Sequence, residues 1–388
     1  MNMKKKILIM AGEKSGDLLG SKIIDSLDKN LFEISIVGGV AMEKSGLKSL
    51  FPMNELSVMG IFEILPKLFN IIKRIEETAR FAVETGQDVV LTIDSPDFCS
   101  RVAKKIRKLD KNNKIKIAHL IAPSVWFYRE NRAKKIAKIY DILFCILPFE
   151  PPYFEKYGLR TIFVGHPLFG QEFKEHDFNN ENHHYRKDSK TISLTPGSRK
   201  TEVKVLLPII VGVVDNLRKI YDFNYTILAT EDTHELIKNY LKNRNIDYIN
   251  LEKDPVKKEI IIKNSLIAIA KSGTNTLEIA AHSIPMVAIY RFNFLTNILA
   301  FLVSKIRTGV KFVNLINILV HREIIPEILL YDCNPDNISK KVSHLIDNEQ
   351  IRIEQIEGNL KTLKALGYGS DDSPSRIIIN EICKLVDV

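Results

Sequence analysis

Short apolar runs rich in β-branched residues alternate along this chain with longer stretches that can form helices. Strands buried on both faces have continuous apolar sequences, whereas strands with one exposed face alternate between apolar and polar residues. The pattern therefore predicts an α/β fold with parallel, doubly wound sheets that helices cover on both faces. The predicted strands are Ile7–Met10, Ile34–Val37, Val89–Ile93, Ile115–Ile121, Ile142–Ile146, Thr161–Val164, Thr191–Leu194, Tyr225–Ala229, Tyr248–Leu251, Leu266–Ala270 and Met286–Tyr290.

A polar segment, Phe169–Ser189, divides the predicted strands into two series. It is rich in Asn, His and charge and has no hydrophobic periodicity, which predicts a linker between two Rossmann-like domains over residues 1–170 and 190–365. A last helix, near 373–388, is expected to pack back on the first domain. Ligands of doubly wound sheets bind outside the carboxyl ends of the strands, so the residues after each strand are the candidate site residues in the cleft between the domains.

Composition places the chain among ordinary globular proteins. Of its 388 residues, 45% are hydrophobic and 27% charged, and the formal net charge is +9. This charge fits an anionic small molecule, an anionic membrane surface or nucleic acid. The four cysteines lack metal-ligand spacing, which disfavours structural zinc and disulfides and favours a reducing, cytoplasmic compartment. No apolar stretch approaches the ~18 residues of a membrane-spanning helix.

Asp94 directly follows the predicted strand Val89–Ile93. In the next residues, Pro96 suits the first helical position, Ser95 the N-cap, and Asp97 the first turn, where a carboxylate favours the helix dipole. Asp94 has no such role, and a carboxylate at the carboxyl end of a strand suits a general base that deprotonates an attacking hydroxyl. A carboxylate that only accepts hydrogen bonds from backbone N–H groups is an equally open alternative.

The loop Thr195–Lys200 is a candidate anion site in the second half of the chain. Ser198 is the predicted N-cap of a long helix, so Arg199 and Lys200 fall in the first turn, where positive charge opposes the helix dipole. Backbone N–H groups together with a guanidinium form a phosphate clamp, which we favour over a solvated basic turn.

The loop after the strand Leu266–Ala270 is the strongest local sign of a nucleotide site. Ser272, Gly273, Thr274 and Thr276 open a predicted helix with hydroxyl and N–H groups that suit a diphosphate. Glu278 lies about one turn inside this helix, where it could reach the hydroxyl pair of a ribose. Helix capping by the hydroxyls and a solvated Glu278 remain the alternative.

Other polar or small residues at strand ends carry weaker signals. Gly12, Gly16 and Gly20 are spaced by four, so they match neither GxGxxG nor GxxxxGK[ST]. They either shape a ligand-binding turn or only permit close packing of a helix on the sheet, and the sequence leaves both open. His119 and His166 also end strands, and both are expected to be structural.

Two strongly apolar segments, 61–75 and 294–311, carry Lys and Arg among their apolar residues. Each fits a buried helix, and each also fits a helix in a membrane interface with cations on anionic headgroups. An enzyme with an acylated substrate needs such a surface. The residues predicted to contact acyl chains or membrane are Ile61, Phe62, Ile64, Leu65, Leu68 and Phe69.

Taken together, these motifs resemble the lipid-A-disaccharide synthase family, bacterial inverting glycosyltransferases of the GT-B type, over most of the chain. The motifs that carry the resemblance are AGEKSGDLLG from Ala11, MGIFEILP from Met59, IDSPDF from Ile93, PSVW from Pro123, LPFEPPYFEKYG from Leu147, FVGHPL from Phe163, PGSR from Pro196, SGTNTLE from Ser272 and NILVHRE from Asn317.

The resemblance implies a specific reaction. UDP-2,3-diacylglucosamine would react with the 6-hydroxyl of 2,3-diacylglucosamine 1-phosphate to give a β-1′,6-linked disaccharide and UDP, without a metal or another cofactor. Asp94 would be the base, Arg199 and the Ser272–Thr274 loop would offset the charge on departing UDP, and Glu278 would hold the ribose. Weaker substrate contacts are implied for Gly12, Ser15, Gly16, Asp17, Asn317 and Arg322. The resemblance also implies a cytoplasmic enzyme peripherally bound to the inner membrane, and a homodimer with exchanged C-terminal segments.

Two other interpretations stay open. One is a different UDP-sugar enzyme of the same fold, such as a UDP-N-acetylglucosamine 2-epimerase or an undecaprenyl-linked N-acetylglucosamine transferase. The other is a non-catalytic basic protein that binds nucleic acid or membranes. Basic residues are dispersed along the chain rather than gathered with aromatic residues, so nucleic acid is not an expected partner.

Overall fold

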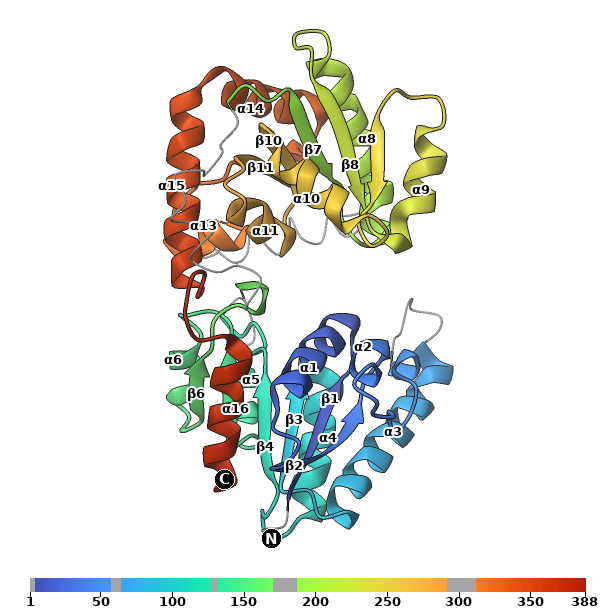
Figure 1. Cartoon of the computed structure of the whole chain (residues 1–388), viewed down its shortest axis with the longest axis vertical. Helices are drawn as coiled ribbons and strands as arrows, with labels where there is room; N and C mark the ends of the chain where they lie inside the picture. Colours follow the sequence, from blue (N-terminus) through green and yellow to red (C-terminus); the bar gives the residue numbers. More distant parts are fainter. Residues whose placement is uncertain (1–3, 57–63, 127–130, 170–186, 292–311) are drawn as a thin grey trace. The chain divides into compact units, whose positions relative to one another are not determined.

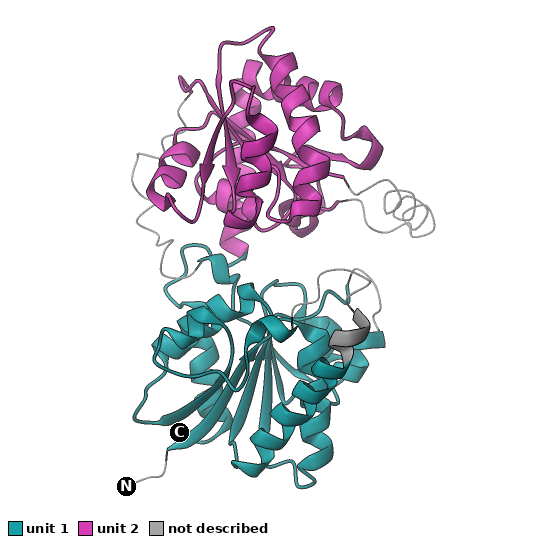
Figure 2. Ribbon diagram, turned by 90° about the vertical axis from the view of Figure 1, so that its right-hand side faces the viewer, with its two compact units in different colours: residues 1–175, 366–388 teal, residues 176–365 magenta. Residues whose placement is uncertain are grey.

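The computed structural model describes residues 4–56, 64–126, 131–169, 187–291 and 312–388. The chain forms two compact units, residues 1–175 with 366–388 and residues 176–365 (Figure 2). Each unit contains a parallel six-stranded sheet, with strand orders β2-β1-β3-β4-β5-β6 and β12-β11-β10-β7-β8-β9. The prediction of an α/β fold with doubly wound parallel sheets is confirmed.

Unit 1 buries both faces of its sheet. Along β1, Leu8 and Met10 pack with residues of α3 and α4, whereas Ile7 and Ile9 pack with residues of α1 and α16. Successive strand residues point to opposite faces, which is why a strand inside two cores has a continuous apolar sequence. The strands are β1 (Lys5–Ala11), β2 (Phe32–Val37), β3 (Val89–Ile93), β4 (Lys116–Leu120), β5 (Ile142–Cys145) and β6 (Arg160–Phe163). The helices are α1 (Lys14–Ser26), α2 (Val40–Glu43), α3 (Ile64–Glu84), α4 (Pro96–Leu109), α5 (Asn131–Ile136), α6 (Pro151–Glu155) and α16 (Pro374–Leu385), with 3-10 turns at Met53–Leu56 and Pro167–Phe169.

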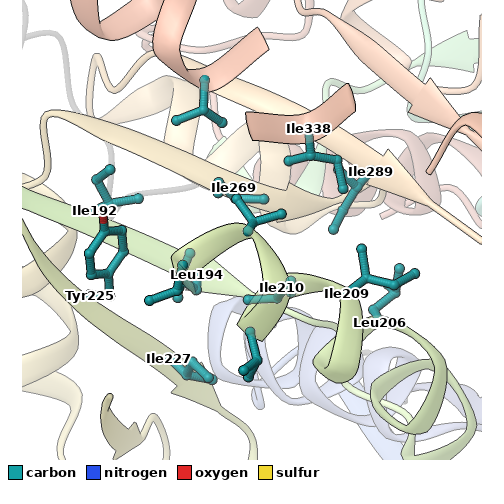
Figure 3. Packing of buried hydrophobic residues seen from close by; sticks show 14 of the residues in the cluster. Ile192, Leu194, Leu206, Ile209, Ile210, Tyr225, Ile227, Ile269, Ile289 and Ile338 are labelled. Carbon is teal, nitrogen blue, oxygen red and sulfur yellow. The ribbon is translucent and has the colours of Figure 1, made fainter. Parts of the chain in front are cut away.

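Unit 2 repeats this plan (Figure 1). Ile192 and Leu194 of β7 and Ile269 of β10 form one core with Ile210 of α8 and Ile338 of α14 (Figure 3). The strands are β7 (Thr191–Thr195), β8 (Asn224–Ala229), β9 (Asp247–Asn250), β10 (Ile267–Lys271), β11 (Met286–Tyr290) and β12 (Glu327–Leu329). The helices are α8 (Lys200–Leu217), α9 (Glu231–Leu241), α10 (Pro255–Lys263), α11 (Asn275–Ala281), α13 (Leu315–Val320), α14 (Pro335–Asp347) and α15 (Glu349–Ala365), with a 3-10 turn at Leu330–Asp332.

The strand order of each sheet reverses once. The chain runs outward from β1 to β2, then continues from β3 on the other side of β1. In unit 2 it runs outward from β7 to β9 and continues from β10 on the other side of β7. Such switch points are where ligands bind in doubly wound sheets, beyond the carboxyl ends of the strands.

Every strand predicted from the sequence is present, with ends within two residues of those expected. The sequence analysis missed β12, which pairs with β11 at the edge of the second sheet. With three residues, one of them Glu327 and preceded by Pro326, it has neither the length nor the apolar run that signals a strand.

The chain returns to unit 1 after α15. The backbone N–H of His166 donates to the carbonyl of Leu366 at 2.8 Å, and α16 follows. Ile378 and Ile382 of α16 are buried in the same core as Ile7, and Glu381 accepts a hydrogen bond from Arg160. The predicted linker lies largely outside the described residues, as does the apolar segment 294–311.

We expect α16 to stabilise unit 1 through its buried face. Replacing the fully buried Ile382 with Ala should lower the free energy of unfolding of unit 1 by about 2–5 kcal/mol, because it removes buried methyl groups and leaves a cavity. Trp126, the only tryptophan of the chain, lies in unit 1 and reports its urea unfolding by fluorescence. Lys384→Ala, on the exposed side of α16, should change the value by less than about 0.5 kcal/mol. Equal effects of the two substitutions would contradict this expectation.

Candidate active site

A sharp turn holds Asp94 at the carboxyl end of β3. Asp94 and Ser95 both have left-handed backbone conformations, with φ of 52° and 43°. The Asp94 carboxylate accepts hydrogen bonds from the backbone N–H of Ser95 at 2.8 Å and from the Ser15 hydroxyl at 3.3 Å. Ser95 occupies the N-cap position of α4, but the expectation that its side chain caps the helix is wrong. A residue that caps a helix with its side chain normally has an extended backbone. The backbone of Ser95 is left-handed, and its hydroxyl makes no capping hydrogen bond.

Asp94 lines a pocket in unit 1 of about 290 Å³. The other walls are Pro96, residues 121–125 and Arg132. Ile121 has a φ of 74°, a conformation that is strained for a β-branched residue. A strained backbone conformation persists only where the surrounding structure holds it in place, and such residues cluster at functional sites. This pocket is therefore the candidate reaction site of unit 1.

The glycine-containing loop after β1 supports this turn. A Cβ on Gly12 would lie 2.4 Å from the Ser95 hydroxyl oxygen, so only glycine leaves room for the turn at Asp94. A Cβ on Gly16 would lie 3.2 Å from the carbonyl oxygen of Ile93, which matches the interpretation of close packing between helix and sheet. Ser15, in the first turn of the following helix α1, contacts the candidate base through its hydroxyl.

Asp17, predicted to contact substrate weakly, has a structural role in unit 1. Its side chain is buried and accepts hydrogen bonds from the backbone N–H groups of Gly39, Ala41 and Met42, at 2.7, 2.9 and 3.2 Å. These donors belong to the first turn of α2, whose N–H groups have no partners within the helix. Its carboxylate therefore anchors α2, and its contact with a substrate stays a prediction.

In unit 2, α8 begins one residue later than expected. Arg199, not Ser198, is the N-cap, and Lys200 is the first helical residue. Gly197, two residues before this N-cap, adopts a φ of 116° and lies against the side chain of Glu202. The Arg199 side chain is 76% exposed, and its Nη1 lies 3.6 Å from Glu202 Oε1. Arg199 is thus an available cation at a helix N-terminus.

The loop Ser272–Thr274 lines a pocket of about 300 Å³ at the end of β10. Lys271, Tyr290, Val313 and Leu315 form its other walls. Ser272 is buried, whereas Gly273 and Thr274 are exposed. This pocket combines hydroxyl and backbone N–H groups with an ammonium, which suits an anionic ligand.

Lys271 is a residue of this pocket that the sequence analysis missed. Its Nζ lies 3.1 Å from Glu202 Oε1 and 5.2 Å from the centre of the Tyr290 ring. A Cβ on Gly273 would lie 3.5 Å from this ammonium, so the charge is next to the loop. The sequence does carry a signal for Lys271: it is the last residue of β10, whose other residues are all apolar.

Two residues predicted to bind substrate, Thr276 and Asn317, make hydrogen bonds that support this loop and its neighbours. Thr276 is buried; its hydroxyl donates to the Gly273 carbonyl at 2.7 Å and accepts from Asn314 at 3.1 Å. Asn317 is also buried, and its amide donates to the Ile325 carbonyl and Glu327 and accepts from the N–H groups of residues 324 and 325. In this structure the side-chain polar atoms of both residues therefore bond within the unit, and their contact with a substrate stays a prediction.

The remaining predicted residues are placed as follows. Glu278 lies in α11 and accepts a hydrogen bond from Lys258, so its carboxylate is already paired. Arg322 is exposed after the end of α13. Phe69 is 77% exposed on α3. Ile61 and Phe62 lie outside the described residues, as do the side chains of Ile64, Leu65 and Leu68.

The two pockets occupy equivalent places in the two units. Asp94 follows β3, and Ser272 follows β10. Each of these strands lies next to the first strand of its unit, at the point where the strand order reverses. One switch point therefore carries a carboxylate, and the other carries a loop with hydroxyl groups and a nearby ammonium.

Comparison with known proteins shows the family of the chain. The family model described as lipid-A-disaccharide synthetase matches residues 7–378. The lipid-A-disaccharide synthase of Rickettsia prowazekii (strain Madrid E) is 41% identical over 379 residues, covering 96% of this chain and 97% of the relative. That of Rickettsia typhi (strain ATCC VR-144 / Wilmington) is 40% identical over 378 residues, with the same two coverages.

Solved structures of low sequence identity share the fold. The S. aureus MnaA–UDP co-structure aligns with a TM-score of 0.65 and 16% identity, covering 99% of this chain and 97% of that one. The UDP-GlcNAc 2-epimerase of Neisseria meningitidis bound to UDP-GlcNAc has a TM-score of 0.65 and 13% identity, covering 98% of this chain and 100% of that one. The glycotransferase of kitacinnamycin has a TM-score of 0.57 and 12% identity, covering 98% of this chain and 99% of that one.

Two buried histidines of unit 1 should make its stability depend on pH. Burial lowers the pKa of His119 and of His166 to about 4, because a desolvated imidazole resists protonation. The unfolded chain therefore binds more protons between pH 6.5 and 4, and each histidine lowers the stability as the pH falls through this range. Burial also raises the pKa of Glu150 to about 7, which acts in the opposite direction, so one stability curve does not separate the groups.

A substitution isolates the contribution of His119. In His119→Gln, the loss of unfolding free energy between pH 7 and pH 5 should be smaller than in the parent by about 2 kcal/mol. Urea unfolding followed by Trp126 fluorescence at the two pH values measures this difference. His344→Gln, which changes an exposed histidine of unit 2, should leave the pH dependence of unit 1 unaltered. The same pH dependence in His119→Gln and the parent would contradict the effect of burial.

Proposed function

This chain belongs to the lipid-A-disaccharide synthase family, and from this premise we propose that it is a UDP-sugar-dependent, inverting glycosyltransferase of lipid A biosynthesis. It transfers 2,3-diacylglucosamine from UDP-2,3-diacylglucosamine to the 6-hydroxyl of 2,3-diacylglucosamine 1-phosphate and releases UDP. The observation that carries the proposal is the match of the family model over residues 7–378, together with relatives about 40% identical over nearly the whole chain.

In the proposed mechanism, Asp94 is the general base. Its carboxylate takes the proton of the acceptor's 6-hydroxyl while that oxygen attacks the anomeric carbon of the donor from the face opposite UDP. The new bond joins the acceptor oxygen to the anomeric carbon, and the bond between that carbon and the diphosphate oxygen breaks. The fixed position of the carboxylate, bonded to Ser95 N–H and the Ser15 hydroxyl, supports this role.

Residues of unit 2 offset the charge that develops on the departing UDP. Arg199 and the backbone and hydroxyl groups of Ser198, Ser272, Gly273 and Thr274 bind its diphosphate, without a metal ion or another cofactor. Donors fixed where negative charge develops stabilise a transition state more than they stabilise the substrate. Lys258 donates a hydrogen bond to one carboxylate oxygen of Glu278. The other oxygen of Glu278 accepts hydrogen bonds from the ribose hydroxyls.

The acylated substrates imply contact with the inner face of the inner membrane. Within the described residues, no helix has the length and apolar character needed to cross a bilayer. Peripheral contact through α3 is supported by Phe69 and Ile72, which are 77% and 52% exposed beside the exposed Lys73. An apolar helix face flanked by cations suits acyl chains or anionic headgroups.

A homodimer with exchanged C-terminal segments is the proposed assembly. The segment 366–388 packs on residues 1–175 of the same chain, through a helix that follows a short connection of turns after α15. An exchange between two copies would reproduce these same contacts, so it needs no new interface for the exchanged segment.

The direct test is to incubate the full chain with both diacylated substrates and to analyse the products by mass. We expect the acylated disaccharide 1-phosphate and UDP in equal amounts, at a rate that a chelator does not change. Loss of activity with the chelator would contradict the metal-independent mechanism. If UDP-N-acetylglucosamine were converted and its diacylated form were not, the protein would be another UDP-sugar enzyme of this fold.

Asp94→Asn should lower kcat by about 10²–10⁴-fold, because the amide cannot accept the hydroxyl proton. The dissociation constant for UDP, measured by calorimetry, should stay within about threefold of the parent, because Asp94 contacts the acceptor. Asp25→Asn removes an exposed carboxylate of α1 and serves as the control, with unchanged kcat. A kcat of Asp94→Asn near that of the parent would remove Asp94 from the role of base.

A further inference from the structure

Arg132 shares the pocket of Asp94 and has no role in the mechanism described so far. It is the second residue of α5, and its side chain is 25% exposed. Of the described residues that line this pocket, Arg132 is the only cation and Asp94 the only anion. The pocket therefore has one negative and one positive group, which a ligand with two different polar ends can satisfy.

The present partner of Arg132 is weakly held. Its Nη2 donates to Asp97 Oδ1 at 2.8 Å, and the Asp97 side chain is 88% exposed. Exposed ion pairs contribute little to stability because water and salt screen them. A phosphate dianion offers more charge and more acceptor oxygens than this carboxylate, so it can displace Asp97 at low cost.

The acceptor of the proposed reaction has the two polar ends that this pocket requires. Its 6-hydroxyl is on C6, which is attached to C5, and its phosphate is on C1; C5 and C1 are the two carbons that flank the ring oxygen. One pocket of about 290 Å³ can therefore receive both groups of a single sugar ring. The Asp94 carboxylate repels the phosphate and attracts a hydroxyl proton, while Arg132 attracts the phosphate.

We propose that Arg132 binds the 1-phosphate of the acceptor and so turns its 6-hydroxyl toward Asp94. This inference rests on the proposed function and adds an acceptor-binding residue to it. A planar guanidinium forms paired hydrogen bonds with a phosphate, which fixes orientation as well as charge. The charge pattern of the pocket thus selects both the phosphorylated acceptor and the hydroxyl that reacts.

The test compares two acceptors that differ only in the phosphate, 2,3-diacylglucosamine 1-phosphate and 2,3-diacylglucosamine. For Arg132→Gln, kcat/KM should fall about 10- to 100-fold with the phosphorylated acceptor, because a charge-assisted hydrogen bond to the phosphate is lost. With the phosphate-free acceptor it should stay within about threefold of the parent, because the lost contact is absent there. Arg132→Lys, which keeps the charge but loses the paired geometry, should restore part of the activity.

Two further variants separate this effect from folding and from general charge. Arg101→Gln removes an exposed cation of the neighbouring α4 and should leave the preference for the phosphorylated acceptor unchanged. Asp97→Asn removes the carboxylate that competes for Arg132, so it should lower KM for the phosphorylated acceptor a few-fold. Asp97→Asn keeps the proposal testable even if Arg132→Gln does not fold.

Several outcomes would overturn the proposal. An equal loss with both acceptors would mean that Arg132 supports the structure rather than the phosphate. No loss with either acceptor, an equal loss in Arg101→Gln, or an unchanged KM in Asp97→Asn would also exclude it. If the parent transferred sugar to neither acceptor, the proposed function itself would fail; activity in the parent with an unaltered preference in Arg132→Gln would refute this inference alone.

Discussion

The burial of both faces of two parallel sheets is the constraint on which the candidate site depends. The apolar side chains of β1 are buried in two cores, with Ile7 and Ile9 on one face and Leu8 and Met10 on the other. The polar residues that line the pockets therefore lie at or beyond strand ends, as Lys271 and Asp94 do, and the carboxyl ends of parallel strands meet at one edge. The packing that stabilises each unit also decides where its polar groups can meet a substrate.

This constraint explains how far the sequence predicts the structure. Continuous apolar runs predicted the strands, and the residues after them were candidates by topology alone, which is how Asp94 and Ser272 were found. What those residues contact could not be predicted in the same way. Asp17 bonds to Gly39 and its neighbours, and Thr276 bonds to Asn314. These partners are distant in sequence, and only the assembled fold shows that they occupy polar atoms that otherwise suit a ligand.

The two failed helix caps have a common cause. Serine was assigned as N-cap at positions 95 and 198 because its side chain favours that role. At Ser95 the backbone is left-handed, and at Ser198 the helix begins one residue later, after Gly197 at a φ of 116°. In both loops the turn geometry at a strand end overrides side-chain propensity. Such overrides are expected where a loop serves a site rather than its own local stability.

The turn at Asp94 shows what this strain achieves. Two consecutive left-handed residues cost about 1–3 kcal/mol each, and the buried sheet supplies the stability that keeps them in place. In return, the Asp94 carboxylate is held by Ser95 N–H and the Ser15 hydroxyl, and the absence of a side chain at Gly12 leaves room for the turn. A carboxylate has about four acceptor positions, so these two bonds leave others for a substrate hydroxyl. Because the carboxylate is already fixed before the substrate binds, none of the substrate's binding energy is needed to order it. This preorganisation offsets the cost of the strained turn.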